Sequence, residues 1–231
     1  MANILKKAAA NLLEKMFTSA EVIAVRAWQP ATMFEVDVHL PSVNMEKWNT
    51  IRRVKCKVDL LEYRDYTPGV WNTETSIFTM FIDAGHNGAG SRWVRQLKAG
   101  DEILLGAVHA AQLPSKEGKI LCIGDGSALG HFLALKQLTD RHSHPMEAGI
   151  FLHDHYESPG SLLTDNPEFD FLVHPHGNSL ATLEQWMLAK EPERYTSIYI
   201  SGEIPVVTAL RKKLKSLPGL NARIYSYGFW S

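Results

Sequence analysis

The stretch ILCIGDGSALG, residues 120–130, gives the clearest indication of how this chain folds. It begins with a continuous apolar run at residues 120–123, which is typical of a β-strand buried on both faces of a parallel sheet. Glycines follow, and residues 127–138 then read as a helix. A glycine-rich turn between such a strand and a helix can bind a phosphate or a nicotinamide. The GxGxxxG spacing departs from the usual GxGxxG, so tight packing of strand against helix explains the glycines equally well.

The rest of the C-terminal half continues this alternation. Short apolar runs predict further strands at residues 150–152, 171–173, 197–200 and 222–225. Residues 204–217 predict an amphipathic helix, because apolar residues recur there at helical spacing. Alternating strands and helices predict a parallel sheet covered by helices, a Rossmann-like α/β domain.

The N-terminal half shows a different pattern of apolar and polar residues. The stretch MFEVDVHL, residues 33–40, alternates apolar and polar side chains, which predicts a strand with one buried face. Further short strands are predicted at residues 22–25, 76–82 and 102–105. Several short antiparallel strands predict a small β-barrel. We therefore expect an N-terminal helix and barrel over residues 1–112, a linker over 113–118 and the α/β domain over 119–231.

Composition narrows the class of protein. The chain has 231 residues and a formal net charge of −1, so no global field attracts nucleic acid or anionic lipid. Its two cysteines, Cys56 and Cys122, form no disulfide or zinc pattern, which favours a reducing compartment. The N-terminal stretch resembles a packing helix rather than a signal peptide, and no window is apolar enough for a membrane span. We expect a cytoplasmic protein.

Two stretches of the N-terminal half carry the residue types that a flavin nucleotide needs. In RDYT, Tyr66 offers an aromatic surface to a flavin ring, and Arg64 and Thr67 offer hydrogen bonds to its ribityl chain and phosphates. In GHNGAGSRW, we expect Ser91 to cap a helix over residues 92–97, whose N-terminus would attract a pyrophosphate. Each stretch alone is also compatible with an ordinary strand or a glycine loop.

The order and spacing of these stretches resemble the ferredoxin-reductase superfamily. More narrowly, they resemble the siderophore-interacting protein family, which comprises FAD-dependent ferric-siderophore reductases. The similar segments are, in order, Arg64–Thr67, Gly90-Ser91-Arg92-Trp93, Gly100-Asp101, Gly124–Leu129, Phe171–His174, Ile200–Glu203 and Tyr227–Trp230. The resemblance covers roughly residues 20 to 230, and it implies a flavin-binding barrel followed by a nucleotide-binding α/β domain.

The resemblance also implies roles for individual residues. FAD would be held by Arg64, Tyr66, Thr67, Gly90, Ser91 and Arg92, with Tyr66 beside the isoalloxazine. A nicotinamide-nucleotide cleft would be formed by Gly124, Asp125, Ser127, Gly202 and Glu203. Because the cofactor carries the chemistry, we expect no catalytic side chain.

The electron donor stays open between NADH, NADPH and ferredoxin, since members of the family differ in this respect. The polar residues expected after the second and third strands, Arg141, His153, His155 and His176, do not favour NADPH over NADH. The sequence ends at Ser231, directly after its aromatic motif, where members usually continue. We expect this end to affect the nicotinamide pocket.

Two further clusters bear on the substrate. Lys55 and Lys57 share one face of a predicted strand and could contact an anionic substrate such as a ferric catecholate. The alternative is an edge strand protected by lysines. Each His-x-His pair could chelate a metal, although we expect that none does. The pairs are His142/His144, His153/His155 and His174/His176.

The sequence therefore predicts a flavin-dependent reductase that passes electrons from NAD(P)H, or from another donor such as ferredoxin, through FAD to the Fe(III) of a siderophore. Two alternatives remain open at this point. The first is a reductase of the same fold with another acceptor, such as free flavin, a quinone or a partner protein. The second is a flavin- or siderophore-binding module without a donor site.

Overall fold

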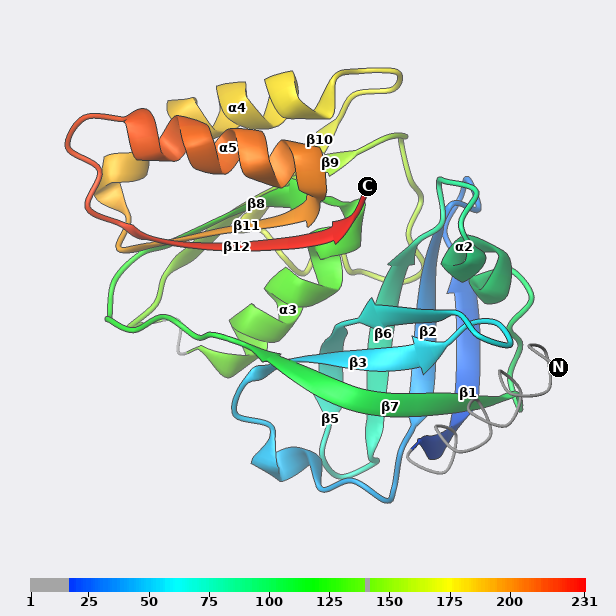
Figure 1. The fold of residues 1–231 in the computed structure, drawn as a ribbon. Coiled ribbons are helices and arrows are strands. Elements are labelled where there is room, and N and C mark those ends of the chain that lie inside the picture. Colours follow the sequence, from blue (N-terminus) through cyan, green and yellow to red (C-terminus); the bar gives the residue numbers. More distant parts are fainter. Residues whose placement is uncertain (1–16, 140–141) are drawn as a thin grey trace, which may run out of the picture.

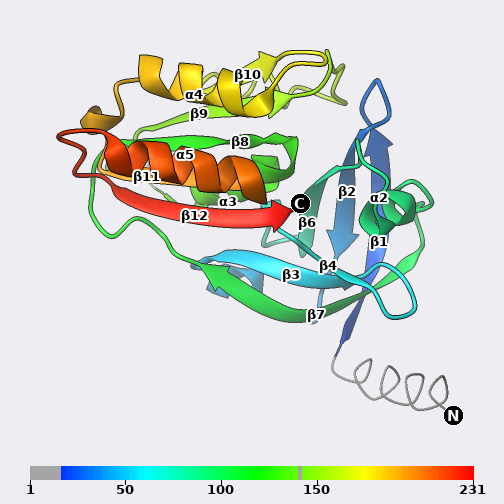
Figure 2. The ribbon, with the colours of Figure 1, turned by 45° about the horizontal axis from the view of Figure 1, so that its top comes forward.

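The computed structural model describes residues 17–139 and 142–231. The predicted N-terminal helix and Arg141 lie outside these residues. Two sheets meet at an angle, with the chain crossing from one to the other once, after β7 (Figure 1, Figure 2). The first is an antiparallel half-barrel and the second is a parallel sheet with helices on both faces. The predicted fold class, an antiparallel barrel followed by a Rossmann-like parallel-sheet domain, is confirmed.

Seven antiparallel strands form the half-barrel, in the order β4-β3-β7-β1-β2-β6-β5. The elements are β1 (Thr18–Ala27), β2 (Met33–His39), η1 (Met45–Lys47), β3 (Ile51–Lys57), β4 (Tyr63–Tyr66), β5 (Pro68–Asn72), β6 (Ile77–Asp83), α2 (Ala89–Val94) and β7 (Glu102–Ala111). The alternation in β2 buries Phe34, Val36 and Val38 as predicted. Glu35 is buried too, because its carboxylate accepts hydrogen bonds from the Trp28 indole at 3.0 Å and the Arg26 guanidinium at 3.1 Å.

The alternative interpretation of Lys55 and Lys57 as guards of a sheet edge is wrong. Strand β3 lies between β4 and β7, and β4 is the edge strand. The physical reason is that the chain turns back after β3, so that Lys55 pairs with Asp65 and Cys56 pairs with Arg64 across the ladder.

Five parallel strands form the second sheet, in the order β10-β9-β8-β11-β12. The elements are β8 (Ile120–Asp125), η2 (Gly126–Ala128), α3 (Leu129–Leu138), β9 (Met146–Leu152), β10 (Phe169–Val173), α4 (Ser179–Ala189), η3 (Pro192–Arg194), β11 (Ser197–Glu203), α5 (Ile204–Ser216) and β12 (Arg223–Trp230). Every residue of β8 is buried, as the apolar run predicts. Helices α4 and α5 cover one face and α3 covers the other (Figure 1). Helix α4 is an addition to the predicted elements.

Helix α3 lies between the parallel sheet and the half-barrel (Figure 1), where two glycines allow direct backbone contact. A Cβ at Gly130 would lie 2.8 Å from the carbonyl oxygen of Thr67, and one at Gly69 would lie 2.8 Å from the Cα of Gly130. The Gln137 side chain accepts a hydrogen bond from the backbone of Trp71 and donates one to it. Strand β5 and helix α3 therefore form a direct contact between the two halves of the molecule.

Three tyrosines hold the connection between β7 and β8 against the parallel sheet. Tyr199 donates a hydrogen bond to the carbonyl of Gln112 at 2.9 Å, and the Tyr227 hydroxyl accepts one from the backbone N–H of Gln112 at 3.0 Å. The hydroxyl of Tyr225 accepts from the N–H of Ser115 at 3.2 Å. The connection is therefore anchored as well as short.

Within the described residues, no helix combines the length and the apolar character that a membrane crossing needs.

We predict that Gly130→Ala lowers the thermal stability of the protein. Alanine normally stabilises a helix relative to glycine, but here the added methyl would enter the contact with Thr67. Overpacking of this kind costs about 1–3 kcal/mol. Thermal unfolding followed by circular dichroism should show a lower Tm for Gly130→Ala. The exposed helical position Thr208 supplies the control, because Thr208→Ala should leave Tm unchanged or slightly raised. An unchanged Tm for Gly130→Ala would show that the close contact between Gly130 and Thr67 does not limit the stability of the protein.

Candidate functional site

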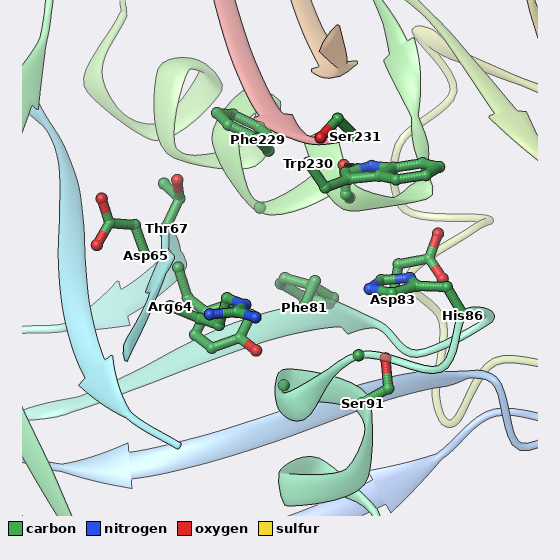
Figure 3. A pocket seen from close by; sticks show the side chains of 15 residues that line it. Arg64, Asp65, Thr67, Phe81, Asp83, His86, Ser91, Phe229, Trp230 and Ser231 are labelled. Carbon is green, nitrogen blue, oxygen red and sulfur yellow. Dashed lines mark hydrogen bonds between the residues drawn. The ribbon is translucent and has the colours of Figure 1, made fainter. Parts of the chain in front are cut away.

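A cavity of about 460 Å³ opens where the half-barrel meets the carboxyl ends of the parallel strands. Both halves of the molecule contribute to it (Figure 3). The half-barrel side is lined by Arg64, Asp65, Tyr66, Thr67, Phe81, Asp83, His86, Gly88, Gly90 and Ser91. The α/β side is lined by Ser127, Gly130, Phe229, Trp230 and Ser231. The cavity thus brings together the RDYT stretch and the GHNGAGSRW stretch, which are separate in the sequence.

Of the residues predicted to hold a flavin, the structure brings five to this cavity. Arg64, Tyr66 and Thr67 reach it from β4 and the turn that follows, and Gly90 and Ser91 reach it from α2. Arg92 is exposed on α2 and is not among the lining residues. The lysines predicted to meet a substrate do not line the cavity either. Lys55 lies on the neighbouring strand β3, where its ammonium contacts Asp65 at 2.7 Å.

The predicted helix cap at Ser91 is wrong. Helix α2 begins at Ala89, with Gly88 at the N-cap position, so Ser91 lies inside the helix. Its hydroxyl is buried and has no hydrogen-bond partner among the described residues. An unsatisfied buried hydroxyl costs roughly 1–3 kcal/mol. Because Ser91 also lines the cavity, a bound polar group is the natural partner for this hydroxyl.

Tyr66 and Gly90 fit together closely at the floor of the cavity. The Tyr66 ring stacks on Trp93 of α2, with ring centres 5.8 Å apart and planes within 13°. A Cβ at Gly90 would clash with the Tyr66 hydroxyl, so glycine is required there. Burial raises the pKa of the Tyr66 phenol well above its usual range. The hydroxyl therefore stays protonated at neutral pH and can donate a hydrogen bond.

The predicted nicotinamide residues divide into one that borders the cavity and four that do not. Ser127 lines it, whereas Gly124, Asp125, Gly202 and Glu203 are not among its lining residues. A Cβ at Gly124 would clash with the backbone of Ser201, and one at Gly202 would clash with the Asp125 carboxyl. Close packing, the alternative that the sequence left open for Gly124, therefore accounts for that glycine and for Gly202 as well.

Asp125 joins the turn after β8 to the turn after β11. Its buried carboxylate accepts hydrogen bonds from the N–H of Ser127 at 2.9 Å and from the N–H of Glu203 at 2.8 Å. Burial is the largest influence and raises the pKa of Asp125 to about 6, helped by the nearby charge of Asp83 and opposed by the hydrogen bonds from Ser127 and Glu203. The carboxylate thus occupies backbone donors that a nucleotide could otherwise use.

Nine of the fifteen lining residues were not predicted as site residues from the sequence, among them Phe81, Asp83, His86 and Trp230. The Trp230 indole donates a hydrogen bond to the Ser127 hydroxyl at 3.2 Å and stacks on His86, with ring centres 5.4 Å apart and planes within 5° (Figure 3). Asp83 lies beside this stack. One available signal was the position of Asp83, a charged residue that ends an apolar strand directly before the glycine loop.

The histidine pairs and the cysteines form no recognisable centre in the part of the chain that is described. No group of three or more His, Cys, Asp or Glu side chains within residues 17–139 and 142–231 is placed to hold a metal ion. Both cysteines are buried free thiols. His174 contacts the Thr182 hydroxyl at 3.1 Å, beside the turn that follows β10.

We predict an unusual pH dependence of stability from Asp125. Its folded pKa of about 6 lies above its ordinary value of 3.8, so its contribution to stability is fully present below pH 3.8 and is lost as the pH rises through 6. Between about pH 4 and pH 7, the free energy of unfolding of the wild type should fall by about 1–3 kcal/mol more than that of Asp125→Asn. Urea unfolding followed by tryptophan fluorescence measures this difference.

Asp37 supplies the matched control for this experiment. Burial raises its pKa, but hydrogen bonds from Arg26 and Thr79 outweigh that effect and lower the pKa below 3.8. Asp37→Asn should therefore differ from wild type most above pH 3.8, with the difference shrinking as the pH falls further. Parallel stability curves for Asp125→Asn and wild type would contradict the assignment to Asp125.

No family model matches the sequence, and no curated protein matches it. Solved structures match it in fold. An intact type IV self-sufficient cytochrome P450 monooxygenase matches 94% of this chain with a TM-score of 0.72 and 15% identity, although this chain spans only 28% of that one. The siderophore-interacting protein from Acinetobacter baumannii matches 92% of this chain and 89% of its own, with a TM-score of 0.67 and 16% identity.

Phthalate dioxygenase reductase, described as a modular structure for electron transfer from pyridine nucleotides to [2Fe-2S], matches 92% of this chain and 68% of its own. Its TM-score is 0.68 and its identity is 12%. At such identities the likeness establishes architecture rather than activity. The chain has the two-domain fold that siderophore-interacting proteins share with reductases of the phthalate dioxygenase reductase kind.

Proposed function

We propose that this protein is a flavin-dependent oxidoreductase that binds FAD in the cavity between the half-barrel and the α/β domain. One observation carries the proposal. The aromatic ring of Tyr66, the guanidinium of Arg64 and the unpartnered hydroxyl of Ser91 line one cavity at the junction of the two halves. These are an apolar surface for a ring, a cation for a phosphate and a donor that lacks an acceptor.

The residues present fit an FAD molecule in several respects. Gly88, Gly90 and Ser91 all line the cavity, so the backbone at the start of α2 borders the space that a phosphate would occupy. Among the described residues, the Arg64 guanidinium contacts the Tyr63 carbonyl at 2.8 Å and, weakly, the Glu62 carboxylate at 3.6 Å, which leaves guanidinium donors for a ligand. FAD rather than FMN suits a cavity that extends from Tyr66 to Ser91, because the second phosphate gives the Ser91 hydroxyl a partner.

Each residue then has a defined task. Tyr66 packs against the isoalloxazine and donates its hydroxyl hydrogen, Thr67 bonds to the ribityl chain, and Arg64 and Ser91 bind phosphate, with Arg92 adding positive charge nearby. When bound, the flavin accepts a hydride and releases electrons one at a time. The protein's own work is to hold the ring at the junction, accessible from both sides.

We place the reduced nicotinamide of NADH or NADPH on the α/β side, at the carboxyl ends of β8 and β11, where Gly124, Asp125, Ser127, Gly202 and Glu203 lie. Ser127 is the member of this set that borders the cavity. The Trp230 indole covers Ser127, so a nicotinamide that reaches this hydroxyl has to displace the indole. A reduced ferredoxin is the alternative donor, since it could deliver electrons without entering this cleft.

For the acceptor, we propose the Fe(III) of a siderophore or a similar chelate. Two points support this choice: the likeness in fold to siderophore-interacting proteins, and the cations Arg53, Lys55 and Lys57 on β3, beside the cavity. Reduction releases iron because Fe(II) binds hard oxygen ligands more weakly than Fe(III). The fold shared with phthalate dioxygenase reductase favours a second candidate, a reductase whose acceptor is a protein. We assign either activity to the cytoplasm.

We predict that Tyr66→Ala weakens FAD binding by about 1–3 kcal/mol, the value of one lost stacking surface. Tyr66→Phe keeps the ring and loses the hydroxyl, so it should lose less affinity than the alanine variant. Fluorescence titration of the apoprotein with FAD measures both. Equal affinity in wild type and Tyr66→Ala would remove Tyr66 from the site and, with it, the main support for the flavin proposal.

We predict that the double variant Lys55→Glu, Lys57→Glu slows electron transfer to an anionic ferric chelate and leaves reduction of the flavin by its donor unchanged. Lys55 and Lys57 are partly exposed, and the attraction of such charges for an anion in solution is screened over about 10 Å at 0.1 M salt. Raising the salt concentration should therefore slow the wild type with an anionic chelate and have little effect with a neutral one. Stopped-flow absorbance resolves the two half-reactions. If the double variant and wild type reduce the anionic chelate equally fast, these lysines play no part in binding it.

A further inference from the structure

Asp83 is a carboxyl group in the cavity for which the proposed function has so far given no task. It ends β6, it borders the cavity, and it is only partly exposed. Its Oδ1 accepts a hydrogen bond from the N–H of Gly85 at 2.8 Å. Its Oδ2 faces the α/β side, where a Cβ added at Gly126 would lie 3.2 Å from it. The carboxyl therefore stands at the junction of the two halves, held by the backbone on one side only.

The groups around Asp83 come from three other segments. Asp125, on β8, is a second buried carboxyl whose pKa is raised in part by the charge of Asp83. His86 in the following loop and His153 after β9 act in the opposite sense, since each lowers the pKa of Asp83. Burial raises the pKa of Tyr156, and the charge of Asp83 raises it further. Burial is the largest effect and outweighs the two histidines, so the pKa of Asp83 lies above the ordinary value of 3.8.

The charge of Asp83 raises the pKa of Asp125, so each carboxylate disfavours ionisation of the other, and a proton on one of the two relieves the repulsion. A second observation points to a ligand in the same cavity, because the buried Ser91 hydroxyl that lines it lacks a partner. The cavity therefore places an exchangeable proton in the same space as a bound molecule.

We propose that Asp83 is the proton-exchange residue of the cavity, giving a proton to the bound flavin as the flavin is reduced and taking one back as it is reoxidised. This inference rests on the proposed function. It assigns Asp83 a role in proton transfer. Asp125 has a structural role instead, because its buried carboxylate accepts hydrogen bonds from the backbone N–H groups of Ser127 and Glu203.

The proposed step balances in atoms and charge. A reduced nicotinamide gives the flavin one hydride, which carries two electrons, and the fully protonated reduced flavin needs one proton more. Asp83 supplies that proton and becomes a carboxylate. Two Fe(III) ions then each accept one electron, and the flavin releases two protons. One returns to the Asp83 carboxylate and the other passes to solvent, which restores the starting state. General acid–base catalysis of this kind contributes about 10²–10⁴-fold to a rate.

Redox-difference infrared spectroscopy of the FAD-loaded protein tests this role directly. The flavin is reduced at an electrode through a mediator, so no nicotinamide is needed. In the wild type, reduction should remove the C=O stretching band of a protonated carboxyl, and the band should shift in D₂O. Asp83→Asn should lack this band, while Asp125→Asn should retain it. Asp83→Asn keeps an oxygen for the Gly85 N–H, and Asp83→Ser serves as a second variant without a carboxyl if the first does not fold.

The outcomes separate the two proposals. If the wild type holds no FAD, the proposed function fails and the role of Asp83 fails with it. If FAD is bound and reduced but no carboxyl band changes, or if the band persists in both Asp83 variants, the role of Asp83 is overturned and the flavin site stands. Loss of the band in Asp125→Asn together with its persistence in Asp83→Asn would transfer the role to Asp125.

Discussion

The contact between the backbone of α3 and the backbone of β5 is the constraint on which the candidate site depends. Gly130 and Gly69 lack the side chains that would separate the two segments, and each would place a Cβ 2.8 Å from backbone of the other side. Because α3 begins at the turn after β8, this contact fixes the carboxyl end of β8 beside the turn after β4. A cavity lined from both halves follows from that placement.

The tyrosine contacts on the connection between the two halves also help to fix how the halves are placed relative to each other. Tyr199 and Tyr225 stack with ring centres 4.4 Å apart, and their hydroxyls hold the backbone of Gln112 and Ser115 respectively. The chain therefore leaves the half-barrel in a defined direction. Together, the glycine contact and the tyrosine contacts bring Ser127 and Tyr66 to the same cavity from the two halves of the molecule. The site depends on packing at its own border, where Gly130 meets Thr67, and on packing along the connection between the halves.

The two-domain fold followed from local patterns, since residues 33–40 alternate and residues 120–123 are continuously apolar, and both patterns report burial directly. The site followed only in part. Glycine-rich sequence has no strong local preference, so it did not reveal where α2 begins or that Gly90 packs against Tyr66, and the expected cap at Ser91 was wrong. Asp83 and His86 meet Trp230 in space although Trp230 lies far from both in the chain, and no local pattern could reveal this meeting. The role of Asp125 as a link between two turns likewise depends on tertiary structure.

The central claim is that the cavity between the half-barrel and the α/β domain holds FAD. The most direct measurement is an absorbance spectrum of the purified protein, followed by mass spectrometry of the molecule released on denaturation. The account predicts the two-banded visible spectrum of an oxidised flavin and the release of FAD in equal amount to the protein chain. A protein that stays colourless after incubation with FAD, or that releases only FMN, would contradict it.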